Sequence, residues 1–140
     1  MLNSQTVASR ALPLNRVPVI QLDASLKKAL DKMTEHRLGI ALIVDSDDKL
    51  VGVLTDGALR RLLLGYQSPL PELLITPAIN FGTRSASVVI SSTSVEEAAK
   101  LMSEKEIWDL PVVDGSGKLI GLVHRHNLNK QEKGFQCLLH

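Results

Sequence analysis

The sequence has little cysteine, few aromatic residues and no excess of charge of either sign. Cys137 is the single cysteine among 140 residues, so no disulfide forms within the chain, which fits a reducing compartment. One Trp, one Tyr and two Phe are too few for the stacking surfaces that bind single-stranded nucleic acid. The formal net charge is +1, from 16 basic and 15 acidic side chains, and it attracts neither nucleic acid nor an anionic membrane.

Long apolar segments are missing as well. The longest aliphatic run, residues 40–44, is far too short to span a bilayer. Residues 1–10 are polar and lack the apolar core of a signal peptide. Hydrophobic residues make up 44% of the chain and charged residues 22%, which is the balance of a globular protein in water. We therefore expect a soluble, cytoplasmic protein.

What the sequence does contain is an ungapped internal repeat. When the chain is shifted by 69 positions, residues 18–59 align with residues 87–128. The alignment holds 11 identities in 42 positions, and most other core positions exchange one aliphatic residue for another. Because the register survives across several predicted elements, we interpret the pattern as a duplication.

Each copy predicts one βαββα unit. Ser25 and Ser94 stand where helix N-caps belong, and Ser94 with Glu97 forms a capping box. Apolar residues then recur at helical spacing, and β-branched runs on either side of a polar turn predict a hairpin. In the first copy we predict a short strand at residues 19–20, a helix at 26–33, a hairpin at 40–54 and a last helix at 58–64. In the second copy the same elements are predicted at residues 88–90, 95–102, 110–123 and from 127 onward. Gly65 is suited to end the first copy's last helix.

A 42-residue unit is too small to bury a core alone, so we expect the two copies to pack against each other. The segment between them is rich in Pro, Gly, Ser and Thr and reads as a loop with one helical turn around residues 72–74. We expect both tails to be weakly ordered. The chain thus divides into an N-terminal tail (1–16), a first repeat (17–66), a linker (67–86), a second repeat (87–129) and a C-terminal tail (130–140).

Two segments at equal spacing carry a resemblance to a known family. They are LIVDSDDKLVGVLTDG at residues 42–57 and LPVVDGSGKLIGLVH at residues 110–124. The pattern resembles a tandem cystathionine-β-synthase (CBS) domain pair, often called a Bateman module, over about residues 18–128. The resemblance implies an α/β (α+β) fold in which two βαββα repeats pack with pseudo-two-fold symmetry. It also implies two clefts between the copies, where adenosyl or other nucleotide ligands bind.

Within this superfamily the chain is most similar to the C-terminal pair of arabinose-5-phosphate isomerases, with the N-terminal pair of some sugar nucleotidyltransferases nearly as close. Neither catalytic domain is present among these residues, so we expect a regulatory module and not an enzyme. The resemblance implies no required cofactor. It implies a ligand of the adenine or cytidine nucleotide type, or a nucleotide-sugar.

The family's ligand site carries over to this chain only in part. The resemblance implies that a Thr at the end of the last strand and the following helix start bind phosphate, while an Asp three residues later binds the ribose. In the first copy Thr55 and Gly57 fit, but Ala58 replaces the Asp. In the second copy His124 replaces the Thr and Asn127 replaces the Asp. Neither copy has the full signature.

Four further residues complete the candidate ligand site. Ile40 and Leu110, near the start of the middle strands, are expected to offer an apolar wall and backbone groups for a base. Trp108 aligns with Gly39 and is either a stacking surface or a packing or dimer-contact residue. Arg125 is placed to meet a phosphate, although an exposed arginine is more often simply solvated.

Metal and catalytic sites are not expected. His124 and His126 share one strand face if the strand extends that far, but no third ligand has a fitting spacing. The sequence shows no Ser-His-Asp set, no paired carboxylates and no Gly-rich phosphate loop.

Two hypotheses of function follow. The first is a sensor that binds a nucleotide or nucleotide-sugar between the copies and controls an attached or partner enzyme of sugar-phosphate or sugar-nucleotide metabolism. The alternative is a ligand-free interaction module with degenerate nucleotide sites, which forms a homodimer through its helices. A leucine stripe on the first copy's last helix would supply that contact: Leu59, Leu62, Leu63 and Leu64.

Overall fold

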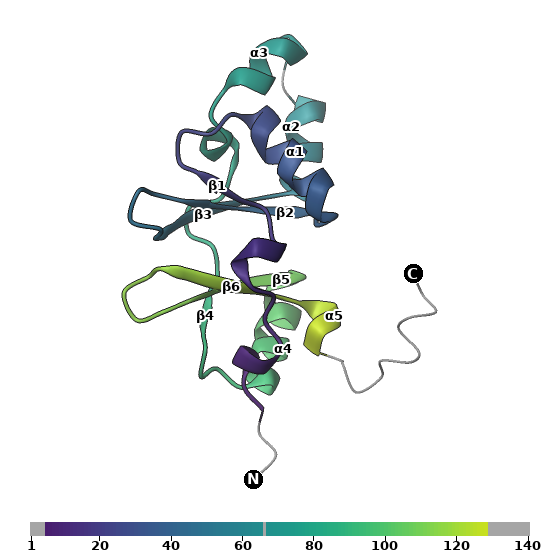
Figure 1. The fold of residues 1–140 in the computed structure, drawn as a ribbon. Helices are drawn as coiled ribbons and strands as arrows, with labels where there is room; N and C mark the ends of the chain where they lie inside the picture. Colours follow the sequence, from purple (N-terminus) through teal and green to yellow (C-terminus); the bar gives the residue numbers. More distant parts are fainter. Residues whose placement is uncertain (1–4, 66, 129–140) are drawn as a thin grey trace.

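The computed structural model describes residues 5–65 and 67–128, which form two similar halves, one above the other in Figure 1. The first half contains β1 (Val19–Gln21), α1 (Leu26–His36), β2 (Ile40–Val44), β3 (Leu50–Thr55) and α2 (Asp56–Gly65). The second contains β4 (Val89–Ile90), α4 (Val95–Lys105), β5 (Asp109–Val113), β6 (Leu119–His124) and α5 (Arg125–Leu128). The predicted βαββα order is confirmed in both halves.

Each half has a three-stranded sheet with the same topology. The strand orders are β1-β2-β3 and β4-β5-β6, with the first pair parallel and the second antiparallel in both sheets. The hairpins share an irregularity at equivalent positions, between Ile43 and Val44 and between Val112 and Val113. The duplication therefore includes the strand register and its bulge.

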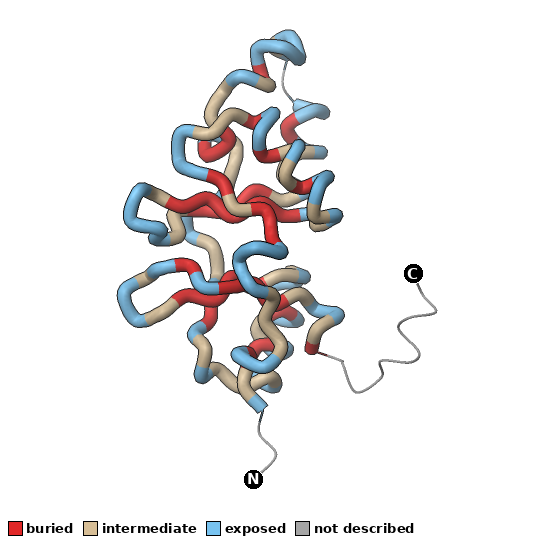
Figure 2. Tube along the Cα trace, in the orientation of Figure 1, coloured by how far each residue is buried: buried red, intermediate tan, exposed pale blue. Residues whose placement is uncertain are grey.

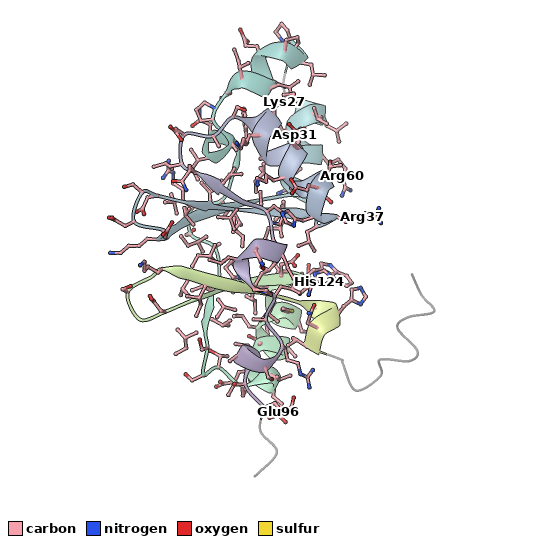
Figure 3. The ribbon with its side chains drawn as sticks, viewed as in Figure 1. Lys27, Asp31, Arg37, Arg60, Glu96 and His124 are labelled. Carbon is pink, nitrogen blue, oxygen red and sulfur yellow. The ribbon has the colours of Figure 1, made fainter. Side chains whose placement is uncertain are left out.

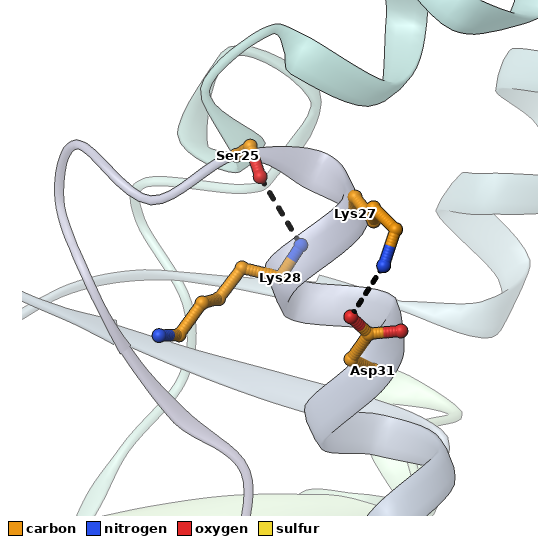
Figure 4. A network of polar contacts seen from close by, with 4 residues as sticks. All are labelled: Ser25, Lys27, Lys28 and Asp31. Carbon is orange, nitrogen blue, oxygen red and sulfur yellow. Dashed lines mark hydrogen bonds and ion pairs between the residues drawn. The ribbon is translucent and has the colours of Figure 1, made fainter.

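The long helix of each repeat begins where the sequence predicts. The Ser25 hydroxyl accepts a hydrogen bond of 3.2 Å from the Lys28 backbone N–H, and Lys27 pairs with Asp31 one turn later at 2.8 Å (Figure 4). Ser94 and Glu97 form the predicted capping box at the start of α4. These caps satisfy backbone N–H groups that have no partner within the helix.

Both helices end in the same way. Arg37 (φ 58°) and Glu106 (φ 57°) take the left-handed conformation that closes a helix, and they are 69 residues apart. The hairpin turns repeat this equivalence, with positive φ at Asp48 (64°) and Gly117 (93°). Equal backbone conformations with different side chains show that the repeat is structural as well as sequential.

Three apolar clusters form the core, one within each repeat and one between them. Figure 2 shows buried residues in both halves, along the strands that face each other. The cluster between the sheets joins residues of both repeats: Val17, Ile40, Leu42, Val44, Val53, Leu119 and Leu122. Two reciprocal bonds link the hairpins, from the Leu50 N–H to the Gly117 carbonyl (3.1 Å) and from the Leu119 N–H to the Asp48 carbonyl (3.0 Å). The halves thus face each other across a pseudo-two-fold axis, as expected.

The N-terminal segment does not fit the prediction of weak order, which is wrong for residues 5–16. This segment forms two short helices, η1 (Val7–Ser9) and η2 (Leu14–Arg16). Val7 is fully buried in the core of the second repeat, and its N–H donates to the Thr93 carbonyl at 2.9 Å. Val7 is too isolated among polar neighbours to give a periodic signal, and only the tertiary structure reveals its partner.

The linker likewise belongs to the folded body. The predicted helical turn is present as α3 (Leu70–Ile75), but a second short helix, η3 (Ala78–Phe81), was not predicted. Ala78 and Ile79 are buried in the core of the first repeat, which the Pro-rich composition concealed. The linker is therefore part of the first repeat's packing and not a free connection.

The two connecting segments cross between the repeats. Leu12, which precedes the first repeat, pairs with Leu122 of β6, whereas Thr83, which precedes the second repeat, pairs with Val53 of β3. Each crossing segment passes so close to a strand that only glycine fits there. A Cβ on Gly121 would lie 2.8 Å from the Leu12 carbonyl oxygen, and a Cβ on Gly52 would lie 2.6 Å from the Thr83 carbonyl oxygen. The segment that precedes each repeat in the chain therefore packs on the other repeat.

In the part of the chain that the structure describes, no helix is long and apolar enough to cross a membrane. The predicted C-terminal tail, residues 130–140, lies outside the described residues. The proposed domain boundaries remain predictions.

Candidate functional site

The candidate site residues lie at the ends of two equivalent hairpins. Ile40 pairs with Thr55 in the first sheet, and Asp109 pairs with His124 in the second. At each hairpin end one backbone bond fixes the turn from strand to helix. The Asp56 N–H donates to the Gly39 carbonyl at 3.0 Å, and the Arg125 N–H donates to the Trp108 carbonyl at 2.8 Å.

In the first repeat Thr55 caps the helix that follows it. Its Oγ1 accepts a hydrogen bond of 3.3 Å from the Ala58 N–H. The Asp56 and Ala58 N–H groups are therefore engaged, and the first turn of α2 leaves the Gly57 N–H and the Thr55 hydroxyl proton as donors. This is a smaller phosphate site than the sequence predicts.

Asp56 occupies the space beside the same turn. A Cβ on Gly39 would lie 2.5 Å from the Asp56 carboxylate oxygen Oδ2, so the carboxylate covers the Gly39 backbone. Its charge is favourable at a helix start but opposes a bound anion. A positive charge is also near, because the Arg61 guanidinium Nη1 would lie 3.6 Å from a Cβ on Gly57.

In the second repeat His124 is bonded to a carboxylate. Its Nδ1 lies 2.7 Å from Asp109 Oδ1, and both side chains are largely buried. The imidazole ring also lies 5.0 Å from that of His126, centroid to centroid. Sequence reasoning selected His124 but missed Asp109, which is equivalent to the apolar Ile40. The pairing of the two hairpin strands could have identified Asp109, because it places Asp109 directly opposite His124.

Trp108 and Arg125 form a pair at the surface. The Arg125 guanidinium carbon lies 4.9 Å from the centroid of the Trp108 ring, within the range of a cation–π interaction. The Trp108 side chain is 56% exposed, which excludes a role in core packing. Of the roles considered for Trp108, a stacking surface and a contact between protomers remain.

The other three candidate residues, Ile40, Leu110 and Asn127, differ in how much of each is accessible to a ligand. The side chains of Ile40 and Leu110 are buried in apolar clusters, so only their backbone groups can meet a ligand. Asn127 lies on α5, and its backbone carbonyl accepts a bond of 2.9 Å from the Arg10 guanidinium. Arg10 was not a predicted site residue, since nothing in the sequence links position 10 to position 127.

The candidate residues come from both repeats, with Thr55 at the hairpin end of the first and His124 at that of the second. Figure 3 labels His124 in the lower half of the view and Arg37 and Arg60 in the upper half. Within residues 5–65 and 67–128, no group of three or more His, Cys, Asp or Glu side chains is arranged to hold a metal ion.

Curated proteins similar to this chain include a sugar-phosphate isomerase. The arabinose 5-phosphate isomerase GutQ of Escherichia coli (strain K12) is 31% identical over 108 residues, which cover 77% of this chain and 32% of that protein. An uncharacterized protein of Helicobacter pylori (strain ATCC 700392 / 26695) is 35% identical over 118 residues, covering 84% of this chain and 34% of the relative. The chain spans about a third of the length of these relatives.

Solved structures with the same fold are CBS-pair proteins. CBSX2 in complex with AMP has a TM-score of 0.80 and 30% identity, covering 94% of this chain and 98% of that one. CBSX2 is a protein of Arabidopsis thaliana. The CBS domain pair of the protein MJ0100, at 21% identity and a TM-score of 0.77, covers 94% of this chain and 98% of its own, and it supports the fold alone.

The family model of the CBS domain matches this chain twice, at residues 9–65 and 81–133. The first match begins within the N-terminal segment that packs on the second repeat, in agreement with the crossing described above. With two matched copies, the repeated βαββα topology and the pseudo-two-fold packing, this chain belongs to the CBS domain family as a tandem pair.

Proposed function

We propose that this CBS pair is a regulatory module that binds a nucleotide-type ligand between its repeats. The observation that carries the proposal is the pair of equivalent strand-to-helix turns, in a chain 30% identical to a CBS pair crystallised with AMP. An adenine nucleotide is therefore the first ligand to test. Cytidine nucleotides and nucleotide-sugars come next.

The chemistry of the turns supports binding without the family's ribose carboxylate. Thr55 and Gly57 offer an O–H and an N–H to a phosphate, and the Asn127 amide can bond one ribose hydroxyl. A hydrogen bond to a charged group contributes roughly 1.5–3 kcal/mol, so losing the carboxylate lowers affinity by about 10- to 150-fold. Binding weaker than in relatives with the full signature is expected.

The module acts on an enzyme and has no catalytic role of its own. Its similarity to an arabinose 5-phosphate isomerase supports an attached or partner enzyme of sugar-phosphate or sugar-nucleotide metabolism. We expect the module to act in the cytoplasm. Ligand binding would shift the equilibrium between two arrangements of the pair, which the enzyme then senses.

A thermal-shift panel tests the proposal. Saturating ligand at ~100 times its dissociation constant stabilises the fold by about 2.7 kcal/mol, which raises the melting temperature by several degrees. The panel contains AMP, ATP, CMP, a CMP-sugar and S-adenosylmethionine, with ribose 5-phosphate as a control for a sugar phosphate without a base. If none of the nucleotides at millimolar concentration shifts the melting temperature, the proposal is wrong.

A second candidate function, self-association through helices, has its own observation. The predicted leucine stripe is divided, because Leu59 and Leu62 face the core of the first repeat. Leu63 (59% exposed) and Leu64 (81% exposed) remain at the surface, near the exposed Leu70 and Ile75 of α3 in sequence. The stripe as predicted is thus wrong in half of its members, and any contact between protomers would use the outer half.

Light scattering across a concentration series tests this alternative. A dimer should dissociate in the Leu63→Asp variant and persist in Leu14→Asp, which alters an exposed leucine of η2. A monomer at every concentration removes the case for self-association.

A further inference from the structure

We propose that residues 5–12, which we call the strap, are the output element of the second repeat. A domain joined ahead of the strap would then sense the second repeat and not the first, although the strap leads into the first repeat in the chain. This inference rests in part on the proposed regulatory function, because it names the repeat whose state is passed on. Backbone bonds, one buried valine and one arginine carry it.

The backbone bonds of the strap lead to the second repeat. The Val95 N–H at the start of α4 donates to the Gln5 carbonyl at 2.8 Å, and the Val7 N–H donates at 2.9 Å to the carbonyl that precedes the α4 N-cap. Leu12 exchanges two bonds with Leu122 of β6, at 2.7 and 3.1 Å. Within residues 5–65 and 67–128, no backbone bond joins the strap to the first repeat. In Figure 1 the purple N-terminal chain accordingly runs along the second half before it enters the first.

The first repeat is held by an equivalent segment, residues 76–83, which precedes the second repeat in the chain. The Leu26 N–H at the start of α1 donates to the Thr76 carbonyl at 2.8 Å, and Thr83 exchanges two bonds with Val53 of β3, at 2.8 and 2.9 Å. The bonding residues of the two segments correspond one to one, 71 residues apart: Gln5 and Thr76, Val7 and Ala78, Leu12 and Thr83. Each segment is therefore bonded to the repeat that it does not lead into.

Arg10 gives the strap a charged link to α5. Its Nη1 donates to the carbonyls of Asn127 (2.9 Å) and Leu128 (3.0 Å), and its Nε donates to Gln5 Oε1 at 3.1 Å. Because the Gln5 carbonyl is bonded to the start of α4, the strap joins two helices of the second repeat. The equivalent position of the other segment is Phe81, which packs against the core of the first repeat. Hydrogen bonds from a charged donor are roughly twice as strong as neutral ones, so the contact with α5 is a strong one.

The strap also shares the apolar core of the second repeat. Val7 is fully buried in one cluster with Met102 of α4 and Leu128 of α5. An opening of α5 exposes part of this cluster and weakens the seat of Val7. Since α5 also carries the candidate ligand residue Asn127, a ligand held there stabilises the strap, and release of the strap weakens the ligand by the same factor.

Amide hydrogen exchange under native conditions, where local openings are measured, tests whether the strap follows the second repeat. Leu128→Ala removes a buried side chain from the cluster that holds Val7. It should speed exchange at the Val7 and Leu12 amides by about 10-fold or more, the consequence expected of shortening a buried leucine. Exchange at these amides equal to that of the parent would overturn the inference.

Leu59→Ala is the matched control, because Leu59 occupies the equivalent position of α2 and packs against the core of the first repeat. It should speed exchange at Ala78 and Thr83 and leave the amides of the strap nearly unchanged. Leu128→Val and Leu59→Val remove less volume and replace the alanine variants if these do not fold. Equal effects of the two substitutions on the strap would show that it does not follow one repeat in particular.

Titration with AMP connects the strap to regulation. AMP at ~100 times its dissociation constant should slow exchange at Val7 and Leu12 by up to about 100-fold, because the opening that frees these amides also releases the ligand. If AMP binds by calorimetry and leaves both amides unchanged, the inference fails and the proposed function stands. If no nucleotide binds, the proposed function fails, and the two leucine variants decide whether the strap follows the second repeat.

Discussion

At the scale of single residues, each hairpin turn depends on one carboxylate. Asp114 Oδ1 accepts bonds from the Ser116 hydroxyl (2.7 Å), the Ser116 N–H (2.9 Å) and the Lys118 N–H (3.0 Å). Asp45 holds the other turn through the N–H groups of Asp47 and Lys49. The bonds to Asp114, led by that from the Ser116 hydroxyl, lower its pKa below the ordinary value of 3.8.

This shift predicts a pH effect at the second hairpin. Because the pKa of Asp114 is lower in the folded than in the unfolded protein, its contribution to stability is present above about pH 4 and is lost as the pH falls further. Ser116→Ala should raise the pKa of Asp114 toward 3.8, as measured by NMR titration of its carboxyl carbon. Ser46→Ala, in the other hairpin, is the control. An unchanged Asp114 titration in Ser116→Ala contradicts the assignment.

The two turns also differ at one position of positive φ. Gly117 adopts φ 93° without steric cost, and Gly117→Ala should lower the free energy of unfolding by about 1–2 kcal/mol. Asp48 adopts φ 64° at the equivalent position, and Asp48→Gly should change stability by less than about 1 kcal/mol, because the relief of strain is offset by a more flexible unfolded chain. Urea denaturation measures both. Equal effects of the two substitutions would contradict the predicted difference in strain.

At the scale of elements, Arg10 connects the N-terminal segment to α5. Its guanidinium Nη1 donates to the carbonyls of Asn127 (2.9 Å) and Leu128 (3.0 Å). These carbonyls lie on the element that carries the candidate ribose residue. The N-terminal segment is thus part of the support of the candidate ligand site.

We expect Arg10→Ala to lower the free energy of unfolding by about 1.5–3 kcal/mol, the range for hydrogen bonds from a charged donor. Amide hydrogen exchange of residues 125–128 should become faster, because α5 loses its contact with the segment. Arg16→Ala, an exposed arginine of the same segment, should alter neither measurement. Exchange at α5 equal in both variants would show that Arg10 does not support this element.

At the scale of the whole molecule, the crossing segments should make the two repeats unfold together. Gly121→Ala places a Cβ 2.8 Å from the Leu12 carbonyl oxygen, and overpacking of this kind costs about 1–3 kcal/mol. Gly115→Ala is the control, since no atom lies within 4 Å of its Cβ position. Denaturation followed by Trp108 emission and by far-UV circular dichroism should give coincident midpoints, both lower in Gly121→Ala. Separate midpoints would mean that the repeats unfold independently.

The fold was predictable because its signals are local and appear twice. The caps at Ser25 and Ser94, the hairpin runs and the 69-residue spacing are all legible in the chain, and all are confirmed. The burial of Val7 and Ile79 was not predictable, since their partners are distant in sequence and their own neighbours are polar or Pro-rich. Local patterns carry no record of such long-range contacts.

By itself, the sequence determined the repeat, the order of its elements and the residue types at each hairpin end, because periodicity, capping and turn chemistry depend on near neighbours. Only the tertiary structure decided which candidates are accessible, because exposure and pairing depend on what packs against each side chain. In the folded chain Ile40 and Leu110 are buried, His124 is hydrogen-bonded to Asp109, and Trp108 and Arg125 lie together at the surface.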